Sequence, residues 1–118
     1  MSQLNDILFY QRHPSFRGQL TDALKISGFN PSCGDKMTLY IKIENDLIID
    51  ARYDGQFCAI AGYGAELLIP KLLNKPLKEA RGITPAKLLS NHHPLLNNPV
   101  RLKCFTQSIQ ILKTMGSK

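Results

Sequence analysis

The sequence predicts an α+β fold with an antiparallel sheet, in which the strands come first and most helices follow. Apolar and polar residues alternate over 37–43, the period of a half-buried strand, and a second strand follows over 47–53. The turn residues Glu44, Asn45 and Asp46 separate the two segments, so we expect an antiparallel hairpin. From residue 59 the chain is rich in Ala, Leu and Ile at helical spacing, which predicts helices that cover the sheet.

The other elements have separate signals in the sequence. We expect, in chain order, a helix over 2–10, a short strand over 23–26, a buried helix over 59–73, helical turns over 77–81 and 85–89, a loop over 91–98, and a C-terminal helix from Pro99 to Gly116. His13-Pro14 ends the first helix, because the residue before a proline disfavours helical geometry. Thr84-Pro85 opens a helix with a capping hydroxyl and a proline at the first helical position.

Three finer details of these elements follow from the same patterns. In the second strand of the hairpin, Ile49, Ala51 and Tyr53 should share one face. Pro70 should kink the helix over 59–73 or end its regular part. The core face of the C-terminal helix should carry Phe105, Ile109, Leu112 and Met115.

Length and composition indicate one domain over 1–118. The chain has 118 residues, of which 43% are hydrophobic and 20% charged, as in ordinary soluble proteins. No stretch approaches the roughly 18 apolar residues of a membrane-spanning helix. The N-terminus lacks a basic segment followed by an apolar one, so we expect no secretory signal and a cytoplasmic location.

The charge is uneven along the chain. Residues 1–70 contain six Lys/Arg and eight Asp/Glu, whereas residues 71–118 contain nine Lys/Arg and one acid, Glu79. A half this basic favours an acidic partner surface, although a solvated basic face with no specific partner explains it equally well. There is no Trp and no Lys/Arg run interleaved with aromatic residues, so an acidic protein surface is favoured over nucleic acid.

The three cysteines, Cys33, Cys58 and Cys104, do not fit a disulfide framework, because their number is odd. Each taken alone could be a small buried hydrophobic residue. The segment Cys33-Gly34-Asp35 argues otherwise, because a glycine in a loop allows a thiolate and a carboxylate to converge on one point. Convergent sulfur and oxygen donors are what a metal ion requires.

The other two cysteines also lie in activating surroundings. Cys58 precedes the predicted buried helix, and a helix N-terminus favours the thiolate. Cys104 falls in the first turns of the predicted last helix, where Arg101 and Lys103 would lower the pKa of its thiol. The sequence therefore favours a metal or sulfur site over three unrelated core cysteines.

Several segments of the chain together resemble a known protein family. The segments that carry the resemblance are Ile7 to Pro14, Gly18-Gln19-Leu20, Asn30 to Asp35, Gly55 to Ala61, and Pro99 to Cys104. Together they resemble the iron–sulfur cluster assembly scaffolds, namely IscU, SufU and the N-terminal domain of NifU. Three cysteine segments in the same order and at nearly the same spacing form a specific pattern, and the resemblance covers nearly the whole chain.

The resemblance implies a fold, ligands and partners. It implies a three-stranded antiparallel sheet packed against helices. It places Cys33, Asp35, Cys58 and Cys104 at the positions that bind Zn²⁺ or a transient [2Fe–2S] cluster. It also implies a cysteine desulfurase that delivers sulfur to a scaffold cysteine, and acceptor proteins that receive the cluster. The protein would then be a scaffold or sulfur acceptor rather than a classical enzyme.

The chain departs from the family pattern at several positions. Many scaffolds have histidine immediately before the third cysteine, whereas this chain has Lys103. A lysine there resembles the SufU branch, whose members tend to act as zinc-dependent sulfur acceptors. Cys104 follows Cys58 by only 46 positions, which leaves no room for that branch's insertion, so the length is IscU-like. Asn98-Pro99-Val100 matches only part of the chaperone-binding loop, so the resemblance does not extend to chaperone-assisted release.

Several alternatives remain open from the sequence. Ligand chemistry does not separate Zn²⁺ from an iron–sulfur cluster, because thiolates bind both. His92 or His93 could replace the missing histidine, although an exposed pair beside Asn and Pro is more often solvated. For the sulfur acceptor we favour Cys104, because of its two cationic neighbours, over Cys33. A closed structural zinc module and, more remotely, a basic RNA-binding domain are the competing functions.

Overall fold

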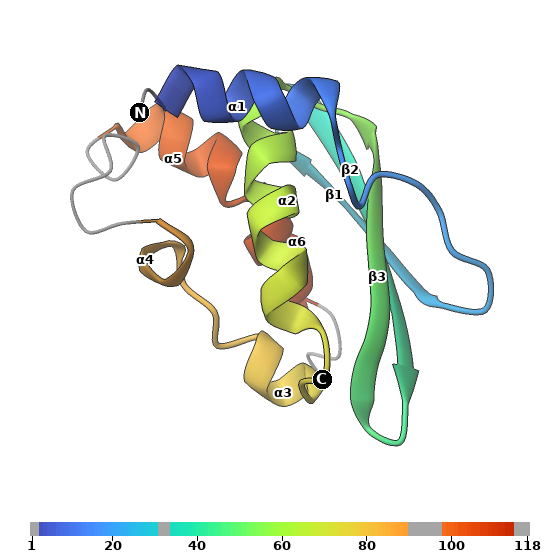
Figure 1. Ribbon diagram of the computed structural model, residues 1–118. Helices are drawn as coiled ribbons and strands as arrows, with labels where there is room; N and C mark the ends of the chain where they lie inside the picture. The colour runs from blue at the N-terminus through green and yellow to red at the C-terminus, as the bar shows by residue number, and fades with distance from the viewer. Residues whose placement is uncertain (1–2, 31–33, 90–97, 115–118) are drawn as a thin grey trace.

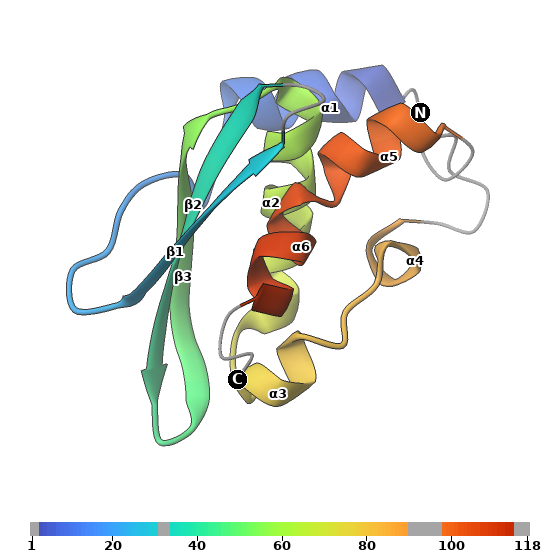
Figure 2. The same ribbon diagram turned by 180° about the vertical axis from the view of Figure 1, so that it is seen from behind.

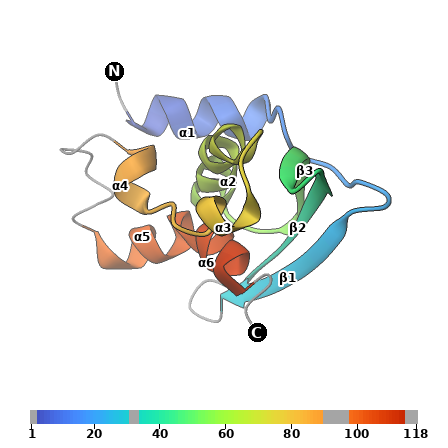
Figure 3. The ribbon, with the colours of Figure 1, turned by 90° about the horizontal axis from the view of Figure 1, so that it is seen from below.

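The computed structural model describes residues 3–30, 34–89 and 98–114, and all its helices lie on one side of a sheet (Figures 1 and 3). The elements are, in chain order, α1 (Gln3–Arg12), β1 (Leu24–Asn30), β2 (Asp35–Glu44), β3 (Leu47–Gln56), α2 (Ala59–Leu72), α3 (Leu77–Ala80), α4 (Pro85–Leu88), α5 (Pro99–Phe105) and α6 (Gln107–Thr114). The predicted α+β class with an antiparallel three-stranded sheet is confirmed. No helix in the described ranges is long and apolar enough to cross a membrane.

The sheet has the order β1-β2-β3, and both neighbouring pairs are antiparallel. The β2–β3 hairpin agrees with the sequence pattern, but its register shifts at an irregularity between Lys42 and Ile43. As a result Ile48 is buried, whereas Ile49 is 42% exposed. The expectation that Ile49 shares a face with Ala51 and Tyr53 is therefore wrong, because such a shift reverses which side chains face the core.

Strand β1 is longer than the predicted segment over 23–26 because Gly28 lies within the strand instead of ending it. Gly28 pairs with Met37 of β2 and faces helix α6. A Cβ atom at Gly28 would lie 2.4 Å from Cγ1 of Ile111. The missing side chain therefore allows α6 to pack closely on β1, a close approach for which glycine in a strand is suited.

The core lies between the inner face of the sheet and the helices α2 and α6 (Figures 1 and 2). Strand residues such as Met37, Leu39 and Ile41 meet Leu68 and Ile109 there, and all five are at most 1% exposed. The prediction of a buried α2 is confirmed, and its helical hydrogen-bonding continues past Pro70 to Leu72. Burial of this kind contributes roughly 25 cal/mol per Å² of apolar surface.

The predicted single C-terminal helix is two helices, α5 and α6, separated at Thr106. Thr106 caps α5, and its backbone N–H donates to the carbonyl groups of Leu102 and Cys104. Phe105, Ile109 and Leu112 are buried, as expected. Met115 and Gly116 lie outside the described residues. The break lets α5 cross α2 near its N-terminal end while α6 lies along the sheet (Figure 2).

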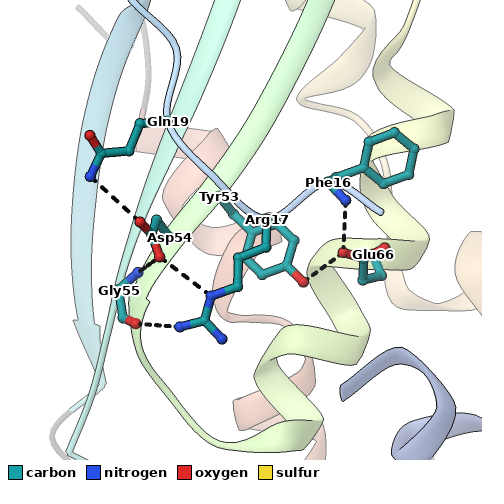
Figure 4. A network of polar contacts seen from close by, with 7 residues as sticks. All are labelled: Phe16, Arg17, Gln19, Tyr53, Asp54, Gly55 and Glu66. Atoms are coloured by element: carbon teal, nitrogen blue, oxygen red, sulfur yellow. Dashed lines mark hydrogen bonds and ion pairs between the residues drawn. The ribbon is translucent and has the colours of Figure 1, made fainter. Parts of the chain in front are cut away.

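A buried carboxylate attaches the N-terminal segment to the core (Figure 4). Glu66 of α2 is 2% exposed and accepts hydrogen bonds from the backbone N–H groups of Ser15 and Phe16, at 3.0 and 3.1 Å. The Tyr53 hydroxyl also donates to Glu66, at 2.7 Å. Burial, reinforced by Glu66, raises the pKa of Tyr53. Because three donors satisfy Glu66, its place inside an apolar helix is physically sound.

Candidate metal site

Three of the predicted ligands meet at one end of the sheet. The ligand atoms of Asp35, Cys58 and Cys104 all lie within 4.8 Å of one another. Asp35 begins β2, Cys58 precedes α2, and Cys104 lies near the end of α5, so three separate elements contribute one donor each. Two sulfur donors and one carboxylate oxygen at this separation form a donor set suited to a thiophilic metal ion.

Two features position Asp35: the backbone turn at Gly34 and a hydrogen bond to one carboxylate oxygen of Asp35. Gly34 has a φ of +72°, a left-handed conformation that favours glycine, and its N–H donates to the carbonyl of Asn30 at 2.8 Å. The expected convergence of Cys33 and Asp35 about Gly34 stays a prediction, because Cys33 lies outside the described residues. Oδ1 of Asp35 accepts the backbone N–H of Cys58 at 3.1 Å. Oδ2 is buried without a hydrogen-bond partner, as expected for an oxygen whose partner is an ion.

Cys58 occupies the N-cap position of α2 and is a partly exposed free thiol. The predicted location at a helix N-terminus is confirmed, but the predicted preference for the thiolate is wrong for the metal-free protein. Burial raises the pKa of this thiol above its ordinary 9.0. The N–H of Ala61 opposes the rise, and the neighbouring Asp35 carboxylate adds to it. Burial and like charge therefore outweigh the helix terminus here.

Cys104 lies in the last turn of α5, not in the first turns of a longer helix as predicted. It is 5% exposed, and it is disulfide-bonded in this structure. The expectation that the odd number of cysteines excludes a disulfide is therefore wrong for this residue. Because a thiolate is the metal-binding form, an ion can bind here only after that bond is reduced.

Lys103 does not close the site by pairing with Asp35. Among the described residues the ion pairs are Arg17–Asp54 and Arg52–Asp50, and Oδ2 of Asp35 has no partner. Lys103 instead lines a groove of about 500 Å³ between the end of β1 and α6. This groove lies beside the three ligand atoms and does not contain them, since neither Asp35, Cys58 nor Cys104 lines it.

The remaining predicted site residues lie outside the described part of the chain. Cys33, His92 and His93 fall in the ranges 31–33 and 90–97. Their roles as ligand, sulfur acceptor or histidine ligand therefore stay predictions.

The contact that Arg17 makes with Asp54 and Gly55, shortly before Cys58 in the chain, was not predicted from the sequence (Figure 4). The guanidinium of Arg17 lies 4.7 Å from the centre of the Phe57 ring and donates to the carbonyl of Gly55 at 2.9 Å. It also pairs with Asp54 at 3.4 Å. The segment after α1 is thereby held against the turn that leads to Cys58. One signal in the sequence points to this region. Glu66 is a lone acid within a predicted apolar helix, which indicates a buried polar contact, and its partners include the backbone N–H of Phe16, next to Arg17.

The raised pKa of Cys58 predicts a measurable reactivity. At pH 8 the metal-free, reduced protein should be alkylated by iodoacetamide at Cys58 more slowly than an unfolded peptide of the same sequence. Asp35→Asn should increase the rate, because removal of the carboxylate lowers the pKa and enlarges the thiolate fraction. Peptide mass spectrometry gives the rate at each cysteine. Asp54→Asn is the matched control, and an equal acceleration in both variants would contradict the role of Asp35.

Comparison with known proteins gives one family. The family model of the NifU-like N-terminal domain matches residues 4–113. The iron–sulfur cluster assembly scaffold protein IscU of Thermotoga maritima is 32% identical over 91% of this chain and 87% of its own length. The zinc-dependent sulfurtransferase SufU of Bacillus subtilis is 27% identical over 72% of this chain, which spans 56% of that protein.

A solved structure agrees with these relatives. It is the crystal structure of a protein from the thermophile Fervidobacterium islandicum AW-1, assigned to the iron–sulfur cluster assembly scaffolds of the SUF system. It superposes with a TM-score of 0.77 at 28% identity and covers 92% of both chains. Fold, ligand cluster and sequence therefore agree, and the chain belongs to the NifU-like N-terminal domain family of IscU- and SufU-like scaffold proteins.

Proposed function

We propose that the protein is an iron–sulfur cluster assembly scaffold. In this proposal it accepts sulfur from a cysteine desulfurase, holds a [2Fe–2S] cluster on Cys33, Asp35, Cys58 and Cys104, and passes it to acceptor proteins in the cytoplasm. The observation that carries the proposal is the meeting of Asp35, Cys58 and Cys104 within 4.8 Å. Cys58 is partly exposed, which suits a site that must load and release its cargo better than a closed structural zinc site.

A zinc-dependent sulfur acceptor is the second candidate. Lys103 precedes Cys104, and no histidine of the described residues joins Asp35, Cys58 and Cys104. The relative from Bacillus subtilis is named as a zinc-dependent sulfurtransferase. In this version Zn²⁺ stays bound while one cysteine carries the sulfur.

Sulfur transfer makes the two candidates distinguishable. The scaffold thiolate attacks the outer sulfur of the donor's persulfide, the donor's S–S bond breaks, and the donor cysteine leaves as a thiolate. We propose Cys104 as the acceptor, because Arg101 and Lys103 flank it and the basic half of the chain favours an acidic donor surface. At 5% exposure, Cys104 needs α5 to be displaced, and the helix break at Thr106 is the place for such a movement.

The test incubates the reduced protein anaerobically with a desulfurase and cysteine, followed by mass spectrometry of each cysteine-containing peptide. We expect the persulfide at Cys104, and an absorbing cluster once ferrous iron and a thiol reductant, which converts the persulfide sulfur to sulfide, are added. Sulfur on Cys33 alone, with retained zinc, would favour the zinc-dependent acceptor. Zinc that stays bound while no cysteine receives sulfur from an active desulfurase would leave a structural zinc module.

A further inference from the structure

We propose that Gln107 is a positioning residue of the metal site. Through a hydrogen bond to the backbone of Asp35, it fixes this residue relative to Cys104. This inference rests on the proposed function, because it concerns the metal site formed by Asp35, Cys58 and Cys104.

Gln107 lies where the cysteine-bearing helix and the first residue of β2 come together. It is the first residue of α6, three positions after Cys104 and just beyond the helix break at Thr106. It is 5% exposed, and its Nε2 donates to the backbone carbonyl of Asp35 at 3.1 Å. The contact joins residues separated by 72 positions in the chain.

Asp35 is thereby held from two sides. The N–H of Cys58, at the start of α2, binds the Oδ1 atom of Asp35, and Gln107 binds its backbone oxygen. These two hydrogen bonds connect β2 to the start of α2 and to α6, the helix that follows the Cys104-bearing α5. They leave Oδ2 of Asp35 unpaired and buried. Such outer contacts orient ligands, and their loss typically costs about 10- to 100-fold in metal affinity.

Two of the unpaired polar atoms of the interior belong to Asp35 and Gln107, the residues joined by this contact. Among the described residues, the buried side-chain oxygen and nitrogen atoms without a hydrogen-bond partner are Oδ2 of Asp35, Oε1 of Gln107 and Oγ of Ser108. A flip of the Gln107 amide would not supply its oxygen with a donor, because it would direct Oε1 at the Asp35 carbonyl.

A buried acceptor left unpaired is costly, and an apolar side chain of the same shape avoids that cost. A glutamine at this position is therefore best explained by the hydrogen bond that its Nε2 donates to the Asp35 carbonyl, which holds the first residue of β2 beside Cys104.

The experiment titrates Co²⁺ into the reduced protein under anaerobic conditions and follows the ligand-field and thiolate charge-transfer bands. We expect Gln107→Met, which keeps the side-chain length and removes both hydrogen-bonding groups, to weaken Co²⁺ binding about 10-fold and to shift the ligand-field bands. Gln107→Asn, whose amide is one methylene shorter, should act in the same direction. If Gln107→Met does not fold, Gln107→Asn is compared with the unaltered protein in its place.

Gln110→Met is the matched control, since Gln110 lies one turn further along α6 and is exposed. It should leave affinity and spectrum unchanged. Unchanged Co²⁺ affinity and bands in both Gln107 variants would overturn the inference, even if their metal-free forms unfold more easily, because the role would then be structural only. Failure of the unaltered protein to bind Co²⁺ through thiolates would instead overturn the proposed function, and the inference with it.

Discussion

Replacement of Cys58 by alanine is expected to abolish stoichiometric metal binding. The unaltered, reduced protein should bind one Zn²⁺ per chain, and a chelator should remove it. Cys58→Ala removes one of the donors that meet within 4.8 Å, so the loss of affinity should exceed the about 10- to 100-fold that outer contacts contribute. Competition with a chromophoric chelator measures the affinity, and elemental analysis gives the stoichiometry.

A pair of carboxylate variants distinguishes a residue that binds the metal ion from a nearby carboxylate that does not. Asp35→Asn should weaken Zn²⁺ binding, whereas Asp54→Asn should not, because Asp54 pairs with Arg17 and is absent from the cluster. Full retention of zinc in the Cys33→Ala/Cys58→Ala double variant would contradict the site, since two thiolates cannot leave a four-ligand site without a large loss.

Elements with a regular pattern and clear boundaries could be predicted from the sequence. The β2–β3 hairpin and α2 follow from alternation, turn residues and continuous apolar character. The register shift at Lys42 and Ile43 could not be predicted, because an irregularity in one strand depends on the partner strand. Nor could the extent of β1, because Gly28 reads as a break until α6 is known to pack on it.

The three residues that meet at the candidate site were predictable, but the electrostatics of the site were not. Asp35, Cys58 and Cys104 were identified from their residue types, local context and family resemblance, and the structure brings them together. The pKa of Cys58 was predicted in the wrong direction, because burial and the closeness of Asp35 are properties of the folded chain. Gln107 carries no sequence signal, since its contact with Asp35 spans 72 residues.

Gly64→Ala is expected to be strongly destabilising and to disturb the metal site as well. In an exposed helix this change would stabilise the protein by about 1 kcal/mol. Here the new Cβ would lie 2.0 Å from the backbone oxygen of Phe105 and 3.0 Å from its carbonyl carbon. Backbone atoms cannot rotate away, so α2 and α5 must separate, at a net cost of about 2 kcal/mol or more. Urea unfolding of the reduced, metal-free protein measures this loss.

Gly62→Ala is the matched control two residues earlier in the same helix. Its Cβ would meet Cε1 of Phe57 at 3.1 Å, a side-chain atom that can shift, so stability should change by less than about 1 kcal/mol. Phe105 follows Cys104, so separation of α5 from α2 also moves Cys104 away from Cys58. Gly64→Ala should therefore weaken Zn²⁺ binding while Gly62→Ala leaves it intact. Equal stability and equal affinity in the two variants would show that the close crossing of α2 and α5 at Gly64 does not hold the ligands together.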